Sequence, residues 1–124
     1  MNLVDSCGWL EYFANGPNAD FFDGPLEDTE QVLVPTICLF EVFKAILRRR
    51  GESEALQAAA AMHQGRLVDL DASLALAAAR IGNEENLPLA DAVILATARA
   101  HDATLWTQDA HFRDIEDVRF VEKR

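Results

Sequence analysis

The stretch QVLVPTICLFEVFKAILRRRG, residues 31–51, joins a short apolar run directly to a long helical one. Residues 31–35 are expected to form a strand buried on both faces, because the run is apolar without alternation. Thr36 is expected to cap the helix of residues 37–50, which ends at Gly51 after three arginines placed where the helix dipole favours cations. A buried strand that leads into a helix is typical of an α/β fold with a parallel sheet.

The same alternation of strand and helix continues along the chain. Strands are expected at residues 2–5, 31–35, 66–70, 103–107 and 118–122, and helices at residues 7–13, 18–28, 37–50, 53–64, 72–86 and from Pro88 onward, with a short helical turn at 109–112. Ser6 is expected to cap the first helix, and Gly24 and Pro25 to interrupt the second. The pattern predicts a parallel sheet covered by helices on both faces, with right-handed crossovers.

Length and composition limit what the chain can be. With 124 residues, of which 50% are hydrophobic and 26% charged, the chain is expected to fold as a single domain over residues 1–124. No apolar run is long enough to cross a bilayer and no signal segment opens the sequence, so we expect a cytoplasmic protein without a membrane partner. Cys7 and Cys38 lack C-x-x-C spacing and are expected to be small core residues rather than a disulfide.

The charge of the chain is strongly acidic. Its 21 Asp and Glu residues face 11 Lys and Arg residues, for a formal net charge of −10 at pH 7. This balance is wrong for a protein that holds nucleic acid on a broad basic surface. Three interpretations stay open: bound divalent cations offset the charge, a basic partner offsets it, or nucleic acid is not the ligand.

Four acidic residues stand where a site is expected. Asp5 ends the first strand and Asp109 follows the fourth, and ligands of parallel sheets bind beyond the carboxyl ends of the strands. Glu41 lies one turn into the helix that leaves the second strand, and Asp91 lies in the first turn of the apolar helix in LPLADAVILATA, residues 87–98. For Asp91 a structural interpretation also stands, since the dipole favours negative charge in the first turn of a helix.

Carboxylates gathered at one edge of a sheet need a compensating charge. At separations of about 5 Å, each pair repels by about 3 kcal/mol at an effective dielectric constant of roughly 20. Protonation relieves part of this repulsion, but a hard divalent cation with oxygen ligands relieves more, so we expect Mg²⁺ or Mn²⁺. The histidines, His63, His101 and His111, have no zinc-ligand spacing.

The ordered set of LVDS at residues 3–6, Glu41 in its apolar helix, LPLADAVILATA, and LWTQDAHF at residues 105–112 resembles the PIN domain, specifically the short VapC-type toxins of bacterial toxin–antitoxin pairs. The likeness covers the whole chain in order. It implies a three-layer α/β/α fold with a mostly parallel sheet of four or five strands. It also implies a metal-dependent endoribonuclease toxin that cuts a structured RNA such as tRNA, forms a homodimer and is neutralised by a small antitoxin.

The resemblance assigns roles to particular residues. The catalytic and metal-binding acids it implies are Asp5, Glu41, Asp91 and Asp109, and the supporting hydroxyls are Ser6 and Thr107. Lys44 and Arg48 follow Glu41 by three and seven residues and share its helix face, so they either meet RNA phosphates or form a solvated ion-pair face. The segments CGWLEYF, residues 7–13, and FFDGPLED, residues 21–28, are expected to form an antitoxin groove or a dimer interface.

Other interpretations compete with this one. LVDLDAS, residues 67–73, resembles the start of haloacid-dehalogenase-like phosphatases, with Asp69 as nucleophile, but too little chain follows; Asp71 is better placed as a helix cap. A receiver-like phosphoacceptor domain needs adjacent acids after the first strand, where this chain has Asp5 and Ser6. A PIN fold that only binds, without catalysis, stays open. His111 either contacts RNA or is a surface residue of its turn.

Overall fold

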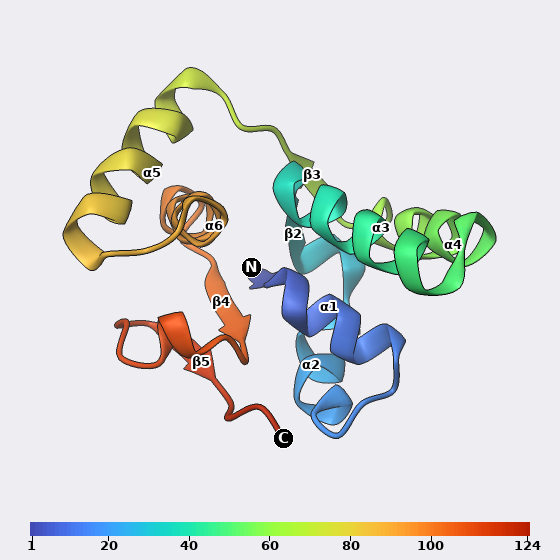
Figure 1. Ribbon diagram of the computed structural model, residues 1–124. Coiled ribbons are helices and arrows are strands. Elements are labelled where there is room, and N and C mark those ends of the chain that lie inside the picture. Colours follow the sequence, from blue (N-terminus) through green and yellow to red (C-terminus); the bar gives the residue numbers. More distant parts are fainter.

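The computed structural model describes residues 1–124 as a five-stranded sheet with six α-helices around it (Figure 1). The strands are β1 (Asn2–Val4), β2 (Val32–Pro35), β3 (Arg66–Val68), β4 (Thr104–Thr107) and β5 (Val118–Phe120). They lie in the order β3-β2-β1-β4-β5, and every neighbouring pair is parallel. The α/β class and the parallel sheet predicted from the alternating pattern are therefore confirmed.

The helices lie on both sides of the central strands. They are α1 (Ser6–Phe13), α2 (Ala19–Leu26), α3 (Thr36–Arg50), α4 (Glu52–Met62), α5 (Ala72–Glu85) and α6 (Leu89–Ala100), with 3-10 turns at Thr29–Gln31 and Ala110–Phe112. Figure 1 shows α5 and α6 on one side of the strands and α1, α3 and α4 on the other. None of these helices has the length and apolar character needed to span a membrane.

The core lies between the central strands and the helices. Strand β2 is buried along its whole length, and every residue of α6 from Asp91 to Ala98 is buried. Helix α1 approaches the sheet closely at Gly8, where a Cβ atom would lie 2.6 Å from side-chain carbons of both Val4 and Phe22. A glycine is therefore required at this crossing, because any side chain there would overlap the core.

Three local predictions are wrong at the helix ends. Asp5, not Ser6, caps α1, because the Asp5 carboxylate accepts a hydrogen bond from the backbone N–H of Ser6 at the point where β1 ends. Thr36 is the first residue of α3 and makes no side-chain cap; Pro35 stands at the cap position. Helix α2 continues through Pro25, which is buried against the core and is followed by the last residue of the helix.

The two edge strands are more exposed than the sequence suggests. Arg66 and Leu67 of β3 are exposed, although we expected short buried strands. β3 and β5 lie at the two ends of the sheet, each pairs with a neighbouring strand on one side only, and no residue of β5 is fully buried.

The strand order creates one site where the chain changes direction in the sheet. From β1 the chain adds β2 and then β3 on one side, and afterwards adds β4 and β5 on the other side of β1. The carboxyl ends of β1 and β4 are therefore neighbours at the switch point, where open α/β sheets bind their ligands.

Candidate active site

The carboxylate of Asp5 is held at the switch point between β1 and β4. Asp5 follows the last residue of β1, and Thr107 is the last residue of β4. The Thr107 hydroxyl donates a 2.7 Å hydrogen bond to Oδ2 of Asp5 and accepts one of 2.9 Å from the backbone N–H of Asp109. Asp5, Thr107 and Asp109 therefore form one connected group across two strand ends.

Glu41 reaches this group from α3. Its Oε1 accepts a 2.7 Å hydrogen bond from the hydroxyl of Ser6, the residue after Asp5. Glu41 is half-buried, whereas Ser6 is buried at the start of α1. The two residues that the resemblance assigned to separate roles are thus in direct contact, and the Ser6 hydroxyl orients the Glu41 carboxylate.

The imidazole of His111 lies between the carboxylates of Asp91 and Asp109. Nδ1 of His111 lies 3.0 Å from Oδ2 of Asp91 and 2.9 Å from Oδ1 of Asp109. The side chain of Asp91 is 12% exposed and that of Asp109 is 29% exposed, while the His111 side chain is 55% exposed. One ligand atom from each of the three residues lies within 4.8 Å of the others, a grouping compatible with a bound metal ion.

Burial and mutual repulsion shape the electrostatics of the site. Burial raises the pKa of Asp5 to about 6, although hydrogen bonds, the strongest of them from Thr107, oppose the rise. Burial also raises the pKa of Asp91 to about 6, with further contributions from the charges of Asp109, Asp5 and Glu41. Because Asp91 responds to all three other acids, the four carboxylates share one electrostatic environment.

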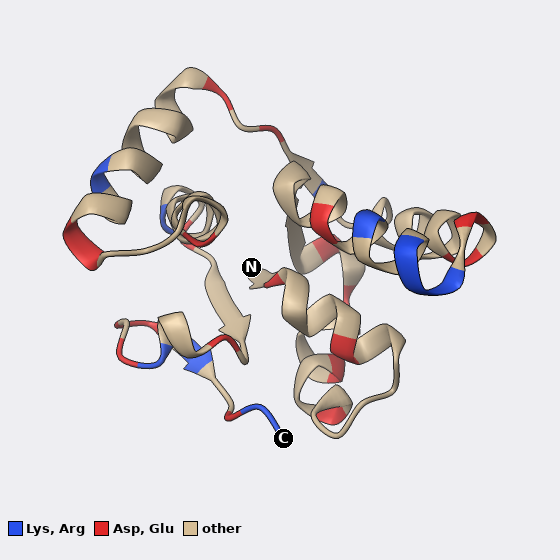
Figure 2. Cartoon of the chain, in the orientation of Figure 1, with Lys and Arg blue, Asp and Glu red and all other residues tan.

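The structure brings together the residues predicted for the site. Asp5, Asp91, Asp109, Glu41, Ser6 and Thr107 all contribute to it. Lys44 and Arg48 lie farther along α3 as exposed side chains, with the Lys44 ammonium 5.7 Å from the centre of the Phe40 ring. Figure 2 shows this basic part of α3 directly beyond an acidic segment of the same helix.

Two side-chain contacts of the site were not predicted from the sequence. Cys7, expected only as a core residue, places its Sγ 3.4 Å from Oδ2 of Asp5. His111 was expected either to contact RNA or to be a surface residue of its turn, yet its ring lies between two acids. The spacing of two residues between Asp109 and His111 was the available signal, since the Asp109 carboxylate also accepts from the His111 backbone N–H.

The donor set of this site suits a hard divalent cation. Its ligand atoms are carboxylate and hydroxyl oxygens with a single imidazole nitrogen, and repulsion among the acids is left uncompensated by any Lys or Arg contact. The structure is thus a parallel α/β sheet with a cluster of acids at its switch point, the place where open α/β sheets bind their ligands.

Comparison with known proteins agrees with this description. The family model of the PIN domain matches residues 3–118, so the chain belongs to the PIN domain family. No curated protein matches the sequence.

Solved structures resemble the fold over nearly the whole chain. A toxin–antitoxin complex from Klebsiella pneumoniae has a TM-score of 0.79 at 23% identity, covering 95% of each chain. VapC20 of Mycobacterium tuberculosis, a toxin that cleaves the sarcin–ricin loop, has a TM-score of 0.78 at 20% identity, covering 99% of this chain and 100% of that one. VapBC2 of Rickettsia felis, bound to promoter DNA, has a TM-score of 0.74 at 13% identity, covering 98% and 97%. At these identities the likeness establishes the PIN fold.

Proposed function

We propose that the chain acts in the cytoplasm as one PIN-like domain over residues 1–124, a VapC-type toxin that hydrolyses RNA with the help of Mg²⁺ or Mn²⁺. The observation that carries the proposal is the convergence of Asp5, Glu41, Asp91 and Asp109 at the switch point of the sheet. Four acids that have one imidazole beside them and no Lys or Arg contact are costly to a fold, which argues for a role that uses their charge.

The carboxylates are the residues that would hold the cation. Asp5 and Asp91 are the firmest candidates, because each is buried and held by named contacts. Glu41 and Asp109 complete the set. When bound, a divalent cation supplies Lewis acidity toward a phosphodiester and neutralises negative charge that develops during its hydrolysis.

The side chains of this chain then have distinct tasks in hydrolysis. Water adds to phosphorus while the bond from phosphorus to the 3′ oxygen breaks, which leaves a 5′ phosphate and a 3′ hydroxyl. The attacking water loses a proton, which a carboxylate of the cluster accepts, and the departing 3′ oxygen takes up a proton from solvent water. The hydroxyls of Ser6 and Thr107 donate hydrogen bonds to Glu41 and Asp5 and so orient these two carboxylates.

A structured RNA such as tRNA is the proposed substrate. Lys44 and Arg48 are exposed on α3 beyond Glu41 and are the basic side chains proposed to meet RNA phosphates beside the acids. The net charge of −10 leaves no broad basic surface, so binding would depend on these few contacts and on the cation. The resemblance in fold to a toxin that cleaves the sarcin–ricin loop supports a folded RNA target.

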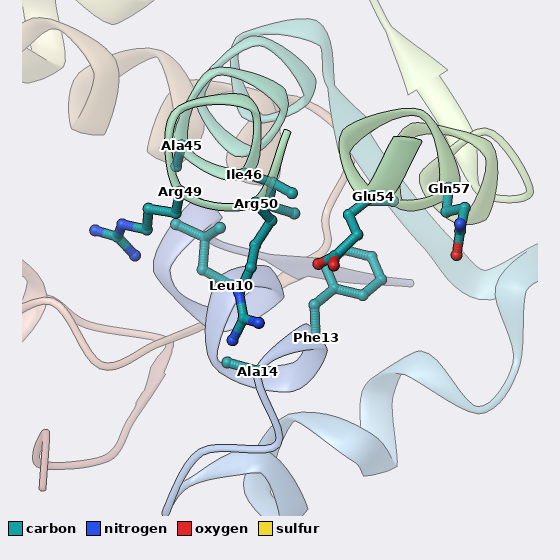
Figure 3. A pocket seen from close by; sticks show the side chains of 10 residues that line it. Leu10, Phe13, Ala14, Ala45, Ile46, Arg49, Arg50, Glu54 and Gln57 are labelled. Atoms are coloured by element: carbon teal, nitrogen blue, oxygen red, sulfur yellow. The ribbon is translucent and has the colours of Figure 1, made fainter. Parts of the chain in front are cut away.

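A small antitoxin is the proposed protein partner. Helix α1 faces α3 and α4 across a groove of about 720 Å³ (Figure 3). Its lining residues are Leu10, Phe13, Ala14, Ala45, Ile46, Arg49, Arg50, Glu54, Gln57 and Ala58. Of the two segments expected to form an antitoxin groove or a dimer interface, residues 7–13 contribute Leu10 and Phe13 to this groove and residues 21–28 contribute none. Apolar antitoxin side chains would fill this groove, and basic antitoxin residues would associate quickly with so acidic a toxin. Structural neighbours that are toxin–antitoxin complexes support the assignment.

A homodimer is also proposed. Large apolar side chains are exposed on α3, α5 and α6, with Phe40 at 59%, Leu76 at 65% and Leu89 at 75%. A two-fold contact would remove such side chains from water. Light scattering of the purified chain would test this assembly directly, and a monomer at all concentrations would contradict it.

The nuclease proposal is tested with purified, antitoxin-free protein and a pool of structured RNAs. Cleavage is expected with Mg²⁺ or Mn²⁺, and none with EDTA. Asp5→Asn and Asp91→Asn should abolish it, whereas the matched variant Asp69→Asn, at an exposed acid of the sheet's far edge, should not. Loss of cleavage in Asp69→Asn as well would show that the effect of these substitutions is not specific to the four-acid site. Metal and RNA binding without cleavage would leave a PIN-fold binding module.

A further inference from the structure

The ring of His111 occupies a position that a surface residue of a short turn does not need. Its Nδ1 lies between Oδ2 of Asp91 and Oδ1 of Asp109, at 3.0 Å and 2.9 Å. The backbone N–H of His111 donates to the same Oδ1 of Asp109 at 2.9 Å, which fixes the residue beside that carboxylate. The ring is therefore placed by its own backbone as well as by its side chain.

These spacings match the edge of a metal coordination shell. Two neighbouring ligands of an octahedral cation with bonds of about 2.1 Å lie about 3.0 Å apart. The distances from Nδ1 to the two carboxylate oxygens have this length. One ligand atom of each residue lies within 4.8 Å of the others, a grouping that a small closure of the three side chains would bring around a single ion.

Resting on the proposed function, we propose that Nδ1 of His111 is a direct ligand of the cation held by Asp91 and Asp109, and that this nitrogen makes the site prefer Mn²⁺ to Mg²⁺. As a ligand, Nδ1 would offer its lone pair and the ring proton would reside on Nε2, in a side chain that is 55% exposed to water.

The preference follows from ligand chemistry. Mg²⁺ is a hard ion that favours oxygen ligands and holds its water tightly, so an imidazole adds little to its binding. Imidazole nitrogen suits first-row transition metals, and Mn²⁺ accepts it together with carboxylates. A site built from oxygens alone lacks this discrimination, and His111 is the residue that introduces it here.

A different role for His111 makes the opposite prediction. If the ring only neutralised the acids by donating its Nδ1 proton, the cation would compete with it for the same oxygens. Removing the ring would then leave Mn²⁺ binding unchanged or make it tighter. The two roles are therefore separated by the direction of the change in Mn²⁺ affinity.

The experiment measures Mn²⁺ binding by electron paramagnetic resonance and Mg²⁺ binding by competition with Mn²⁺. The variants are His111→Gln, which keeps a polar side chain without an imidazole, and His63→Gln, a control at an exposed histidine of the turn after α4. Pulsed measurements on bound Mn²⁺ should detect coupling to a coordinated ¹⁴N nucleus in the wild type and in His63→Gln, and none in His111→Gln. The Mn²⁺ Kd of His111→Gln should rise by about tenfold to 100-fold relative to the wild type, whereas the Mg²⁺ Kd should change by less than about threefold.

The wild-type spectrum alone can overturn the inference. Mn²⁺ bound to wild-type protein without ¹⁴N coupling, or an unchanged or tighter Mn²⁺ Kd in His111→Gln, would refute His111 as a ligand. Either result leaves the nuclease proposal standing if Mg²⁺ or Mn²⁺ still supports RNA cleavage. Absence of any Mn²⁺ binding by the wild type would also overturn this inference, whereas the metal-dependent nuclease would be refuted only if neither Mg²⁺ nor Mn²⁺ supported RNA cleavage.

Discussion

The hydroxyl of Thr107 donates a 2.7 Å hydrogen bond to Oδ2 of Asp5, joining the ends of β4 and β1 through side chains 102 positions apart in the sequence. Both residues are buried. Because the donor stabilises the charged carboxylate, it holds the pKa of Asp5 below the value that burial alone would give. This contact therefore bears on the pH at which the site can bind a cation.

Thr107→Val should shift the acid limb of RNA cleavage to higher pH. Valine keeps the volume of threonine but removes the donor, so the pKa of Asp5 should rise above its value of about 6 in the wild type. Thr97→Val is the matched control, since Thr97 is also buried but donates its hydroxyl to the backbone carbonyl of Val93 within α6. Rates between pH 5 and 8 check the shift; equal profiles for both variants would contradict it.

Asp91→Asn should stabilise the cation-free protein above pH 6. The pKa of Asp91 is raised by burial from 3.8 to about 6, so the folded state binds this proton more tightly than the unfolded state does. The cost of the charge is fully present above about pH 6 and is lost as the pH falls toward the unfolded pKa near 4. Removing the charge should add about 2 to 3 kcal/mol to the free energy of unfolding at pH 8.

Urea unfolding in EDTA at pH 8 and pH 4 measures this difference. Asp69→Asn is the control, and as an exposed substitution it should change stability by less than about 0.5 kcal/mol at both pH values. An Asp91→Asn variant less stable than the wild type at pH 8 would show that the carboxylate stabilises the fold in its charged form.

Adding Mn²⁺ should stabilise the wild type against urea, and removing it with EDTA should reverse the gain. A ligand that binds only the folded state at 100 times its Kd adds about 2.7 kcal/mol. Asp5→Asn should lose this gain, because its neutral amide no longer attracts the cation. Unfolding midpoints that do not depend on Mn²⁺ over the whole titration range would contradict a metal site among these acids.

The α/β fold could be predicted because its signals are local. The apolar run at residues 31–35, followed by helical spacing to Gly51, identifies one strand–helix unit, and the rule for parallel sheets then places Asp5 and Asp109 at one edge. The exposure of β3 was not predictable in the same way. It depends on the position of that strand in the sheet, which the sequence pattern does not specify.

Within the site, too, features with a local sequence signal could be predicted, whereas contacts that depend on the folded arrangement could not. Asp91 was identified because an acid in an apolar helix is unusual in any structure. The contact of His111 with Asp91 joins residues 20 positions apart and depends on a side-chain conformation, so no repeating pattern in the sequence predicts it. The choice between Asp5 and Ser6 as the cap of α1 was ambiguous, since both residue types favour that position.

Replacing Lys44 and Arg48 together by alanine should weaken RNA binding and reduce its dependence on salt. The association constant falls as the salt concentration rises. For every single-strand RNA phosphate that the variant no longer neutralises, the magnitude of the slope of log K against log salt should decrease by about 0.7. Arg80→Ala is the control, because Arg80 is exposed on α5 rather than on α3. Filter binding over a range of NaCl concentrations checks this, and an unchanged slope in the double variant would assign these residues to a solvated face.

Ala14→Arg should release the chain from its antitoxin while leaving RNA cleavage intact. Ala14 is exposed at the end of α1 and lines the groove opposite Arg50, so a long cationic side chain there would fill the space and face a like charge.

The probe is a small protein that copurifies with the tagged chain and abolishes cleavage by the wild type. The concentration needed for half-inhibition should rise at least about tenfold, which equals 1.4 kcal/mol. Ala60→Arg, exposed on α4 and outside the groove lining, should stay as sensitive as the wild type. Equal inhibition of both variants would place the antitoxin on another face.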